Sequence, residues 1–166
     1  GANKMKNIIK LIGIFTLMSS ASIMAAEGNY ETIAMGDGVF STIETANGSL
    51  MMGNVSGTAV ITNGAGLFKT DMTNEWTCLI QATDQDGVKV IQANCTAYFP
   101  ALKSSLFTEL KRKTGNIGSE NDGGDGLVQL TGGTGQLEGI SGTCEYSIQY
   151  IGVTKSVTKQ VCSYSN

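Results

Sequence analysis

The residues that could carry out chemistry in this chain are carboxylates, tyrosines and lysines, because its 166 residues include no histidine. Histidine is the commonest general base and a frequent metal ligand, so its absence disfavours a hydrolase or a zinc site. A carboxyl group inside a barrel would have its pKa raised by desolvation and could act as a general acid or base. The weak catalytic candidates are Glu109, Tyr98 and Lys103, and the other residues to inspect in such an interior are Glu75, Trp76, Glu145 and Tyr146.

One acidic stretch is similar to the first half of a calcium-binding EF-hand loop. Asp84 and Asp86 alternate ahead of Gly87, but Cys95 stands at the twelfth loop position, where an EF-hand needs a glutamate. The dipeptide Asp86-Gly87 also suits a type I′ hairpin turn. We therefore interpret this stretch as a structural turn.

A second acidic stretch offers a weaker alternative metal site at Glu120, Asp122 and Asp125. These carboxylates lie within Gly115–Gly126, a polar segment with five glycines that we expect to be a mobile loop. A solvated acidic loop is the preferred interpretation. The sequence thus predicts no cofactor and no firmly bound metal ion.

A glycine-rich motif, Gly132-Gly133-Thr134-Gly135, invites comparison with a phosphate-binding loop. No Lys-Ser/Thr follows it, as a P-loop requires, and an extended run rather than a helix comes next. Glycine reaches positive φ without steric cost, so the motif predicts a forced backbone path. We interpret these four residues as a structural turn between two strands within residues 127–150.

The first 26 residues predict a secretory signal peptide. Two lysines, Lys6 and Lys10, precede the apolar run LIGIFTLM, and small residues follow as far as Ala26. Residues 1–4 precede Met5 and are interpreted as a remnant or an upstream extension. An uncleaved amphipathic anchor is the alternative, although the apolar run is far shorter than the ~20 residues of a membrane span. Cleavage would leave residues 27–166 as a single secreted or periplasmic domain.

Composition limits the partners of this domain. Residues 1–26 hold three of the 11 basic residues and none of the 14 acidic ones, so eight basic and 14 acidic residues remain, a net charge of −6. This balance disfavours nucleic acid and stable contact with an anionic membrane. We expect a small apolar ligand or a second copy of the chain as partner.

Two disulfides are expected, because four cysteines behind a signal peptide form bridges before they form metal sites. If Asp86-Gly87 is a two-residue hairpin loop, Cys78 faces Cys95 in a non-hydrogen-bonded pair, about 4.5 Å apart at Cα. That separation suits a disulfide. Cys144 and Cys162 are equidistant from Val153, which predicts the second bridge across another hairpin.

The rest of the domain predicts an all-β sandwich or barrel. Short β-prone runs are separated by turn signals at intervals of about ten residues. One stretch differs, because leucines recur every four residues after Pro100, and a basic triplet precedes Gly115. These start and stop signals predict a short helix over residues 101–113. The expected strands are Thr32–Ala34, Val39–Thr45, Leu50–Met52 and Thr58–Thr62, and the expected breakers are Gly36-Asp37-Gly38, Asn47-Gly48, Gly53-Asn54 and residues 63–66.

The segment GGTGQLEGISG, residues 132–142, resembles the glycine signature of the allene oxide cyclase and dirigent barrel superfamily. The hairpin CLIQATDQDG, residues 78–87, together with the GGTG motif, resembles uncharacterised secreted bacterial proteins of that barrel type. The resemblance implies an antiparallel eight-stranded barrel with a central cavity, often oligomeric and, in a bacterium, secreted or periplasmic. Gln136 and Leu137 depart from the basic and aromatic residues that are usual after GGTG, and no catalytic residue carries over.

Three hypotheses about function follow. The leading one is a disulfide-stabilised barrel that binds a small apolar ligand or serves as a structural module. The second is a cyclase or isomerase that works without a cofactor, through the shape of its cavity and one or two buried acids. The third is an assembly protein of the cell surface. A desolvated glutamate inside an apolar cavity, or a tyrosine and a lysine converging there, would favour the enzyme, whereas a completely filled interior would exclude both the ligand and the enzyme hypotheses.

Overall fold

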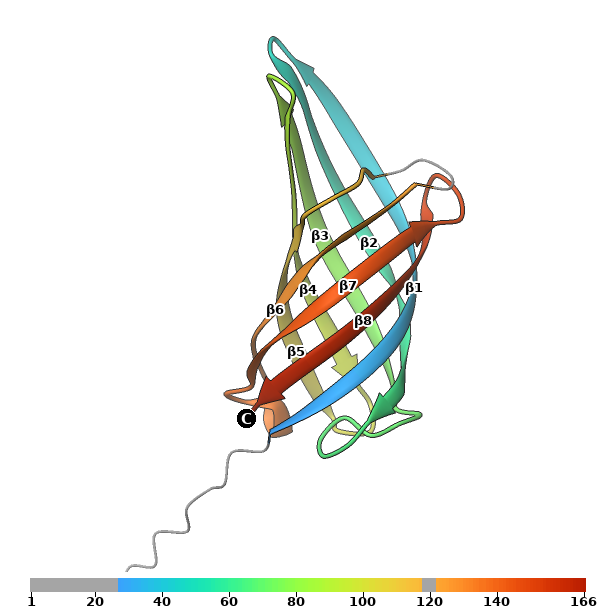
Figure 1. Ribbon diagram of the computed structural model, residues 1–166, viewed down its shortest axis with the longest axis vertical. Helices are drawn as coiled ribbons and strands as arrows, with labels where there is room; N and C mark the ends of the chain where they lie inside the picture. Colours follow the sequence, from blue (N-terminus) through green and yellow to red (C-terminus); the bar gives the residue numbers. More distant parts are fainter. Residues whose placement is uncertain (1–26, 118–121) are drawn as a thin grey trace, which may run out of the picture.

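The computed structural model describes residues 27–117 and 122–166, which form one closed antiparallel barrel of eight strands (Figure 1). The predicted signal peptide and the candidate metal ligand Glu120 lie outside the described residues. Each strand pairs with its neighbours in sequence, and the last closes on the first. The strands are β1 Glu27–Thr45, β2 Gly48–Gly64, β3 Thr73–Gln85, β4 Val88–Phe99, β5 Ser104–Arg112, β6 Gly123–Gly133, β7 Ser141–Tyr150 and β8 Lys155–Ser165, with a 3-10 turn, η1, at Gly135–Leu137.

The alternation of side chains along the strands accounts for the barrel. In β7, for example, Cys144, Tyr146 and Tyr150 are buried while Glu145 and Ser147 are exposed. A period of two places one set of side chains inside and the other in solvent. The predicted all-β fold and the eight-stranded closed barrel are confirmed. In the part of the chain described, no helix is long and apolar enough to cross a membrane.

The hairpin of β3 and β4 has the predicted register. Asp86 and Gly87 form its two-residue loop with φ of 51° and 79°, the left-handed values that a type I′ turn requires. Gln85 pairs with Val88, and Cys78 pairs with Cys95. The two cysteines are 4.1 Å apart at Cα and form a disulfide, as predicted.

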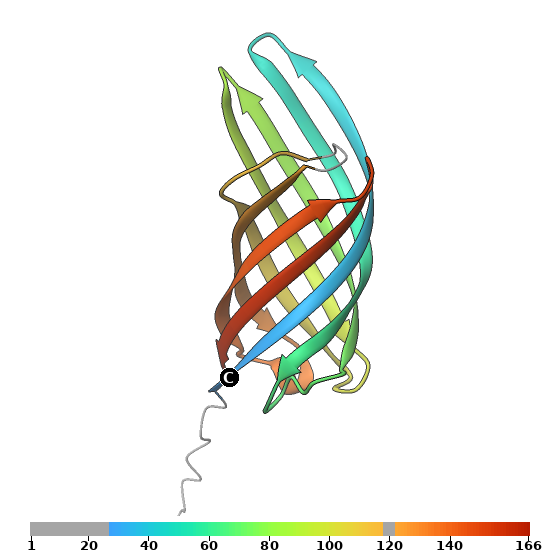
Figure 2. The same ribbon diagram turned by 45° about the vertical axis from the view of Figure 1, so that its right-hand side comes forward.

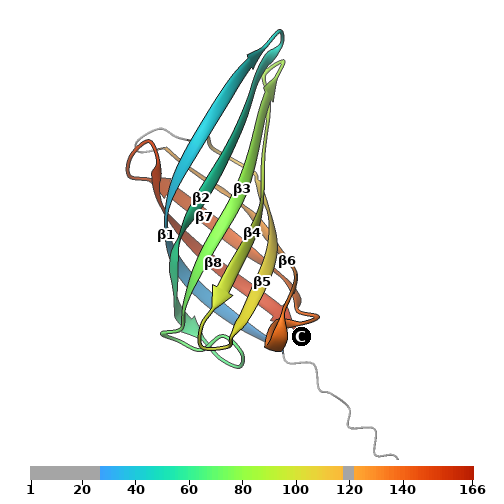
Figure 3. The ribbon, with the colours of Figure 1, turned by 180° about the vertical axis from the view of Figure 1, so that it is seen from behind.

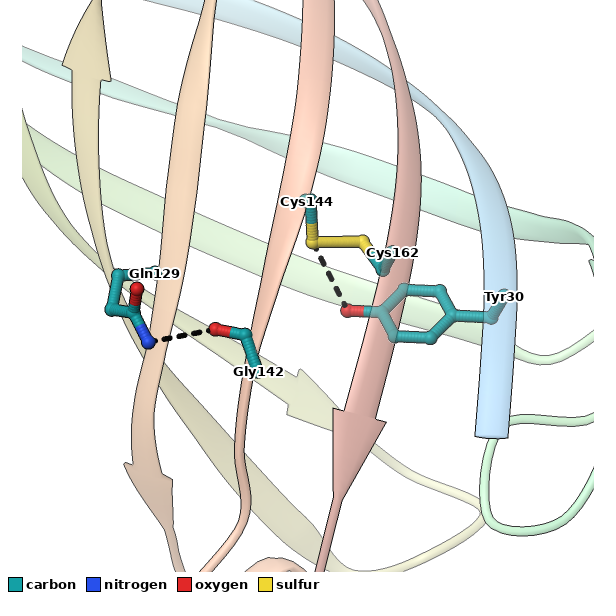
Figure 4. Close-up of a disulfide and its surroundings, with 5 residues drawn as sticks. All are labelled: Tyr30, Gln129, Gly142, Cys144 and Cys162. Carbon is teal, nitrogen blue, oxygen red and sulfur yellow. Dashed lines mark hydrogen bonds between the residues drawn. A yellow bond between two sulfur atoms is a disulfide. The ribbon is translucent and has the colours of Figure 1, made fainter. Parts of the chain in front are cut away.

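The hairpin of β7 and β8 carries the second predicted disulfide, Cys144–Cys162 (Figure 4). Both cysteines are fully buried in the core. The hydroxyl of Tyr30 on β1 lies 3.9 Å from Sγ of Cys144. A disulfide sulfur carries no proton, so the tyrosine is the donor of this weak contact.

The helix predicted over residues 101–113 is wrong, because β5 occupies Ser104–Arg112. A spacing of four residues also fits one face of a strand, and Leu106 and Leu110 both face the barrel interior there. Pro100 begins a tight turn in which Leu102 N donates to Phe99 O at 3.1 Å. The strand is favoured because it pairs with both β4 and β6 and thereby closes the barrel.

Two of the expected breakers, Gly36-Asp37-Gly38 and Gly53-Asn54, lie inside strands, so the short runs predicted around them merge into β1 and β2. These glycines make room for side chains instead of turning the chain. A Cβ at Gly36 would lie 2.5 Å from the Trp76 ring, and one at Gly53 would lie 2.3 Å from the Phe40 ring. Large rings packed over strand glycines explain why the strands continue.

Two turn predictions shift in position. The β1–β2 hairpin exists, but its two-residue loop is Ala46-Asn47, and Gly48 with φ of 147° opens β2. The loop expected over Gly115–Gly126 is shorter than predicted, since Gly123–Gly126 belongs to β6. The β1–β2 and β3–β4 hairpins extend well beyond the other strands at the same end of the barrel (Figures 1 and 2).

The opposite end of the barrel is filled. Phe68, from the loop between β2 and β3, is fully buried and packs on Tyr30, Phe99 and Tyr164 with ring centroids 4.4, 5.1 and 5.0 Å away. The backbone of this loop is held by the Tyr164 hydroxyl, which accepts from Leu67 N at 3.1 Å and donates to Ala65 O at 3.2 Å. This loop lies at the lower end in Figure 3, and η1, whose Leu137 is fully buried, lies at the same end.

The two disulfides should contribute unequally to stability. They close loops of similar length, with separations of 17 and 18 residues, so loop closure contributes about 3 kcal/mol for each. Cys144–Cys162 is also packed in the filled core, so its removal should leave a cavity as well. We expect Cys144→Ala/Cys162→Ala to lower the free energy of unfolding more than Cys78→Ala/Cys95→Ala, as measured by urea denaturation. Equal losses in the free energy of unfolding would contradict this prediction.

The presence of both bridges is tested separately. The intact mass of the parent protein under non-reducing conditions should be four hydrogens below the all-thiol value.

Stability at alkaline pH should depend on Tyr30. Burial, and secondarily the neighbouring Tyr164, raise the pKa of the Tyr30 phenol. A raised folded-state pKa contributes stability that is complete below the unfolded value of about 10 and is lost as pH rises through the folded value. The free energy of unfolding of Tyr30→Phe should therefore fall less steeply above pH 10, by about 1.4 kcal/mol per pH unit. Urea denaturation between pH 7 and 11 measures this, with exposed Tyr98→Phe as control; identical slopes for Tyr30→Phe and the parent protein would refute it.

Candidate functional site

The barrel interior above the filled core contains a cavity of about 120 Å³. It extends toward the end of the barrel at which the β5–β6 and β7–β8 loops lie, since Ile117 and Thr154 from those loops line it. That volume is close to the roughly 150 Å³ of an apolar cavity that binds benzene. The apolar part of its lining outside the core comprises mainly Ala34, Phe40, Val55, Ala59, Trp76, Ile80, Ile91, Ala93, Ala97, Ile148 and the Cys78–Cys95 disulfide. The polar part comprises Thr32, Asn74, Thr108, Arg112, Tyr146, Tyr150, Thr154, Ser156, Thr158 and Gln160.

The cavity exists because small residues occupy inward positions in β1, β2 and β4. Ala34, Ala59 and Ala93 face inward there, whereas the corresponding faces nearer the closed end carry phenylalanine, leucine and tyrosine. Trp76 enters between them, with its ring packed over Gly36. Trp76 shares the inward face of β3 with Cys78, and both residues line the cavity.

Two polar atoms in the cavity wall lack hydrogen-bond partners among the described residues. They are Nε1 of Trp76 and Oγ1 of Thr32. A buried polar group without a partner costs about 1–3 kcal/mol, so such groups call for an explanation. Both side chains line the cavity, which makes them available to a molecule inside it.

The open end of the cavity carries a cluster formed by Arg112, Tyr146 and Tyr150. Arg112 Nε donates to the Tyr146 hydroxyl at 2.8 Å, and one terminal nitrogen donates to the Tyr150 hydroxyl at 3.4 Å. The other terminal nitrogen donates to Asn116 O at 3.0 Å, and the guanidinium also lies 5.7 Å from the centre of the Tyr146 ring. Arg112 is the one charged residue among those described that line the cavity.

Glycines make the space for this cluster. A Cβ at Gly126 would lie 2.4 Å from the Tyr146 ring, and one at Gly124 would lie 2.6 Å from a terminal nitrogen of Arg112. Both glycines are in β6, which pairs with β5 on one side and β7 on the other. The glycine-rich stretch that was predicted to be entirely loop therefore accommodates the arginine inside the barrel.

The protonation states of the cluster follow from burial and contact. Burial disfavours the charge of Arg112, but the Tyr146 and Tyr150 hydroxyls outweigh it and raise the pKa of the guanidinium. Burial also raises the pKa of the Tyr146 phenol, although the positive charge of Arg112 opposes that rise. The cluster is thus a cation beside a neutral phenol, and it includes no carboxylate.

The candidate catalytic residues do not converge. Glu109 and Tyr98 are exposed on the outer face of the barrel, and Lys103 is in the β4–β5 turn with φ of 50°. Glu75 and Glu145 are also exposed. Of the residues named for inspection, only Trp76 and Tyr146 line the cavity.

The candidate calcium ligands have ordinary structural surroundings. Asp84 pairs with Lys89 at 3.7 Å in the β3–β4 hairpin, and a side-chain oxygen of Asp125 accepts from the Thr114 hydroxyl at 3.2 Å. Asp122 contributes its backbone oxygen to Tyr150 N. Within residues 27–117 and 122–166, no three His, Cys, Asp or Glu side chains are grouped as metal ligands.

Sequence reasoning missed Arg112 and Tyr150. Arg112 was attributed to the C-terminus of a helix within the triplet Lys111-Arg112-Lys113. The available signal was the alternation in β5, because a strand places Arg112 on the same face as Leu106 and Leu110. Tyr150 likewise follows Cys144 and Tyr146 on the inward face of β7.

The GGTG motif lies at the closed end of the barrel, where it comprises the last two residues of β6 and the first two of the β6–β7 connection. Gly132 and Gly135 have φ of 141° and 58°. The Thr134 hydroxyl accepts from Ser105 N at 2.9 Å, and Gln136 N donates to the Ser104 hydroxyl at 3.0 Å. These contacts attach the connection to the beginning of β5.

Comparisons with known proteins bear on the fold. No protein-family model matches the sequence, and no curated protein matches it. Among solved structures, the pterocarpan synthase dirigent protein GePTS1 is similar over 87% of this chain and 88% of its own, with a TM-score of 0.50 and 11% identity. The pterocarpan synthase dirigent protein PsPTS1 is similar over 86% of this chain and 95% of the PsPTS1 chain, with a TM-score of 0.40 and 14% identity. The chain therefore has a dirigent-like β-barrel fold, as the resemblance in sequence implied.

Proposed function

We propose that this protein binds a small, largely apolar molecule in the open half of its barrel. The observation that carries the proposal is the cavity itself, which is lined by alanine, valine, isoleucine and one tryptophan above a filled core. Pockets for small molecules are concave and mostly apolar, with a few polar groups that fix orientation. Thr32, Trp76 and the Arg112 cluster supply those groups.

Binding or orientation of a ligand is better supported than acid–base catalysis. The cyclase hypothesis required a buried carboxylic acid, and the described lining of the cavity contains neither aspartate nor glutamate. One similar solved structure is that of a pterocarpan synthase dirigent protein. By analogy of fold, the barrel could hold a molecule in one orientation while it reacts, without proton transfer from the protein.

We place the protein in a secreted or periplasmic setting. Its two disulfides involve all four cysteines of the chain, and such bridges persist in oxidising compartments. The sequence of residues 5–26 supports the same location.

The single tryptophan provides a direct test, because Trp76 lines the cavity and no other indole contributes to fluorescence. Addition of 3-phenylpropan-1-ol, a neutral probe with one ring, should change the Trp76 emission in a saturable way. We expect a dissociation constant on the order of 1 mM or below. Native mass spectrometry of protein from its own host should show a co-purifying small molecule.

A variant that fills the cavity provides the control. Ala93→Phe puts a ring into the cavity and should abolish the saturable change, although overpacking is expected to cost about 1–3 kcal/mol of stability. Gln92→Phe adds the same ring at the neighbouring exposed position and should bind as the parent protein does. Unchanged binding by a folded Ala93→Phe protein would exclude the cavity as the site.

A further inference from the structure

We infer that the ligand is a small organic acid, whose carboxylate pairs with Arg112 while its apolar body lies against Trp76. This inference rests on the proposed ligand site and adds the chemical class of the molecule. It follows from the hydrogen bonds in the cavity wall and from Arg112, the one charged residue among the described residues that line it.

The Arg112 cluster has unused hydrogen-bond donors and no strong hydrogen-bond acceptor. A guanidinium has five N–H groups. Three donate to Tyr146, Tyr150 and Asn116 O, so two remain, one on each terminal nitrogen. Each tyrosine hydroxyl accepts from Arg112 and keeps its own proton, which it can donate. A carboxylate, which only accepts, is complementary to such a cluster.

The charge balance leads to the same ligand class. Arg112 is partly buried, and none of the described aspartates or glutamates forms an ion pair with it. The ion pair recorded among the described residues joins Lys89 to Asp84 instead. The attraction between a cation in a cavity wall and an anionic partner is stronger than the attraction between the same two charges in water.

A third observation extends the match to the body of the ligand. Trp76 lines the same cavity as Arg112. The indole ring itself offers a flat apolar surface held over Gly36. Because Trp76 and Arg112 line the same cavity, we expect a molecule with one ring and a short acidic tail to place its ring toward Trp76 and its acid toward the cluster.

Matched probes test the inference. The acid is 3-phenylpropionate and the neutral control is 3-phenylpropan-1-ol, which has the same carbon skeleton. In titrations of Trp76 fluorescence at low salt, the acid should bind roughly tenfold more tightly than the alcohol. In Arg112→Met this preference should disappear, because the acid loses its cationic partner and should bind no more tightly than the alcohol does to the same variant.

Control variants separate local recognition from general charge and from misfolding. Lys111→Met removes one positive charge from the adjacent, exposed position and should retain the tenfold preference. Arg112→Lys keeps the charge but loses the fork of donors, so it should show an intermediate preference. Circular dichroism and thermal melts establish that each variant is folded.

Each outcome decides a different point. Equal affinity for acid and alcohol in the parent protein, or an unchanged preference in Arg112→Met, would overturn the organic-acid inference and leave the apolar site in place. Absence of binding by both probes would overturn the proposed site as well. If the parent protein shows no preference for the acid and Glu120→Gln shows one, the Glu120 carboxylate neutralises Arg112 in the parent protein. The organic-acid inference is then also wrong.

Discussion

The packing of one aromatic ring, Phe68, determines what the interior of this barrel can hold. Its contacts with Tyr30, Phe99 and Tyr164 fill one end, and the Tyr164 hydroxyl fixes the loop that carries it. An eight-stranded barrel is just wide enough for side chains to fill it or to enclose one small molecule. Because the lower half is filled in this way, the space that remains is closed at its base.

The size of the inward residues then changes along the barrel. Phenylalanine, leucine and tyrosine face inward at the closed end, whereas alanine faces inward farther along β1, β2 and β4. Glycines compensate wherever a large side chain enters: Gly36 lies under Trp76, and Gly124 and Gly126 lie beside Arg112 and Tyr146. Packing density inside proteins is high, so a cavity bounded by matched large and small residues is a specific feature of this sequence.

The separation of charges explains why binding is favoured over acid–base chemistry. Glu75, Glu109 and Glu145 point into solvent, where ionised carboxylates cost nothing to keep. The one charge among the described cavity residues belongs to Arg112, and the Tyr146 and Tyr150 hydroxyls partly replace its hydration. A guanidinium does not release its proton in proteins, so Arg112 is suited to pairing with an anion, as proposed above, rather than to proton transfer.

The sequence by itself determined the features that depend on short-range periodicity and turn chemistry. A two-residue loop at Asp86-Gly87 sets the register of β3 and β4, and that register brings Cys78 opposite Cys95. Only the tertiary structure decided that residues 104–112 form a strand, because leucines four residues apart satisfy both a helix face and a strand face, and pairing with β4 and β6 selects the strand. It also decided that Gly36 and Gly53 continue strands, since the rings packed over them come from elsewhere in the barrel wall. The site depends on the same closure, which brings Arg112 of β5 beside Tyr146 and Tyr150 of β7 across glycines of β6, a juxtaposition that no local pattern encodes.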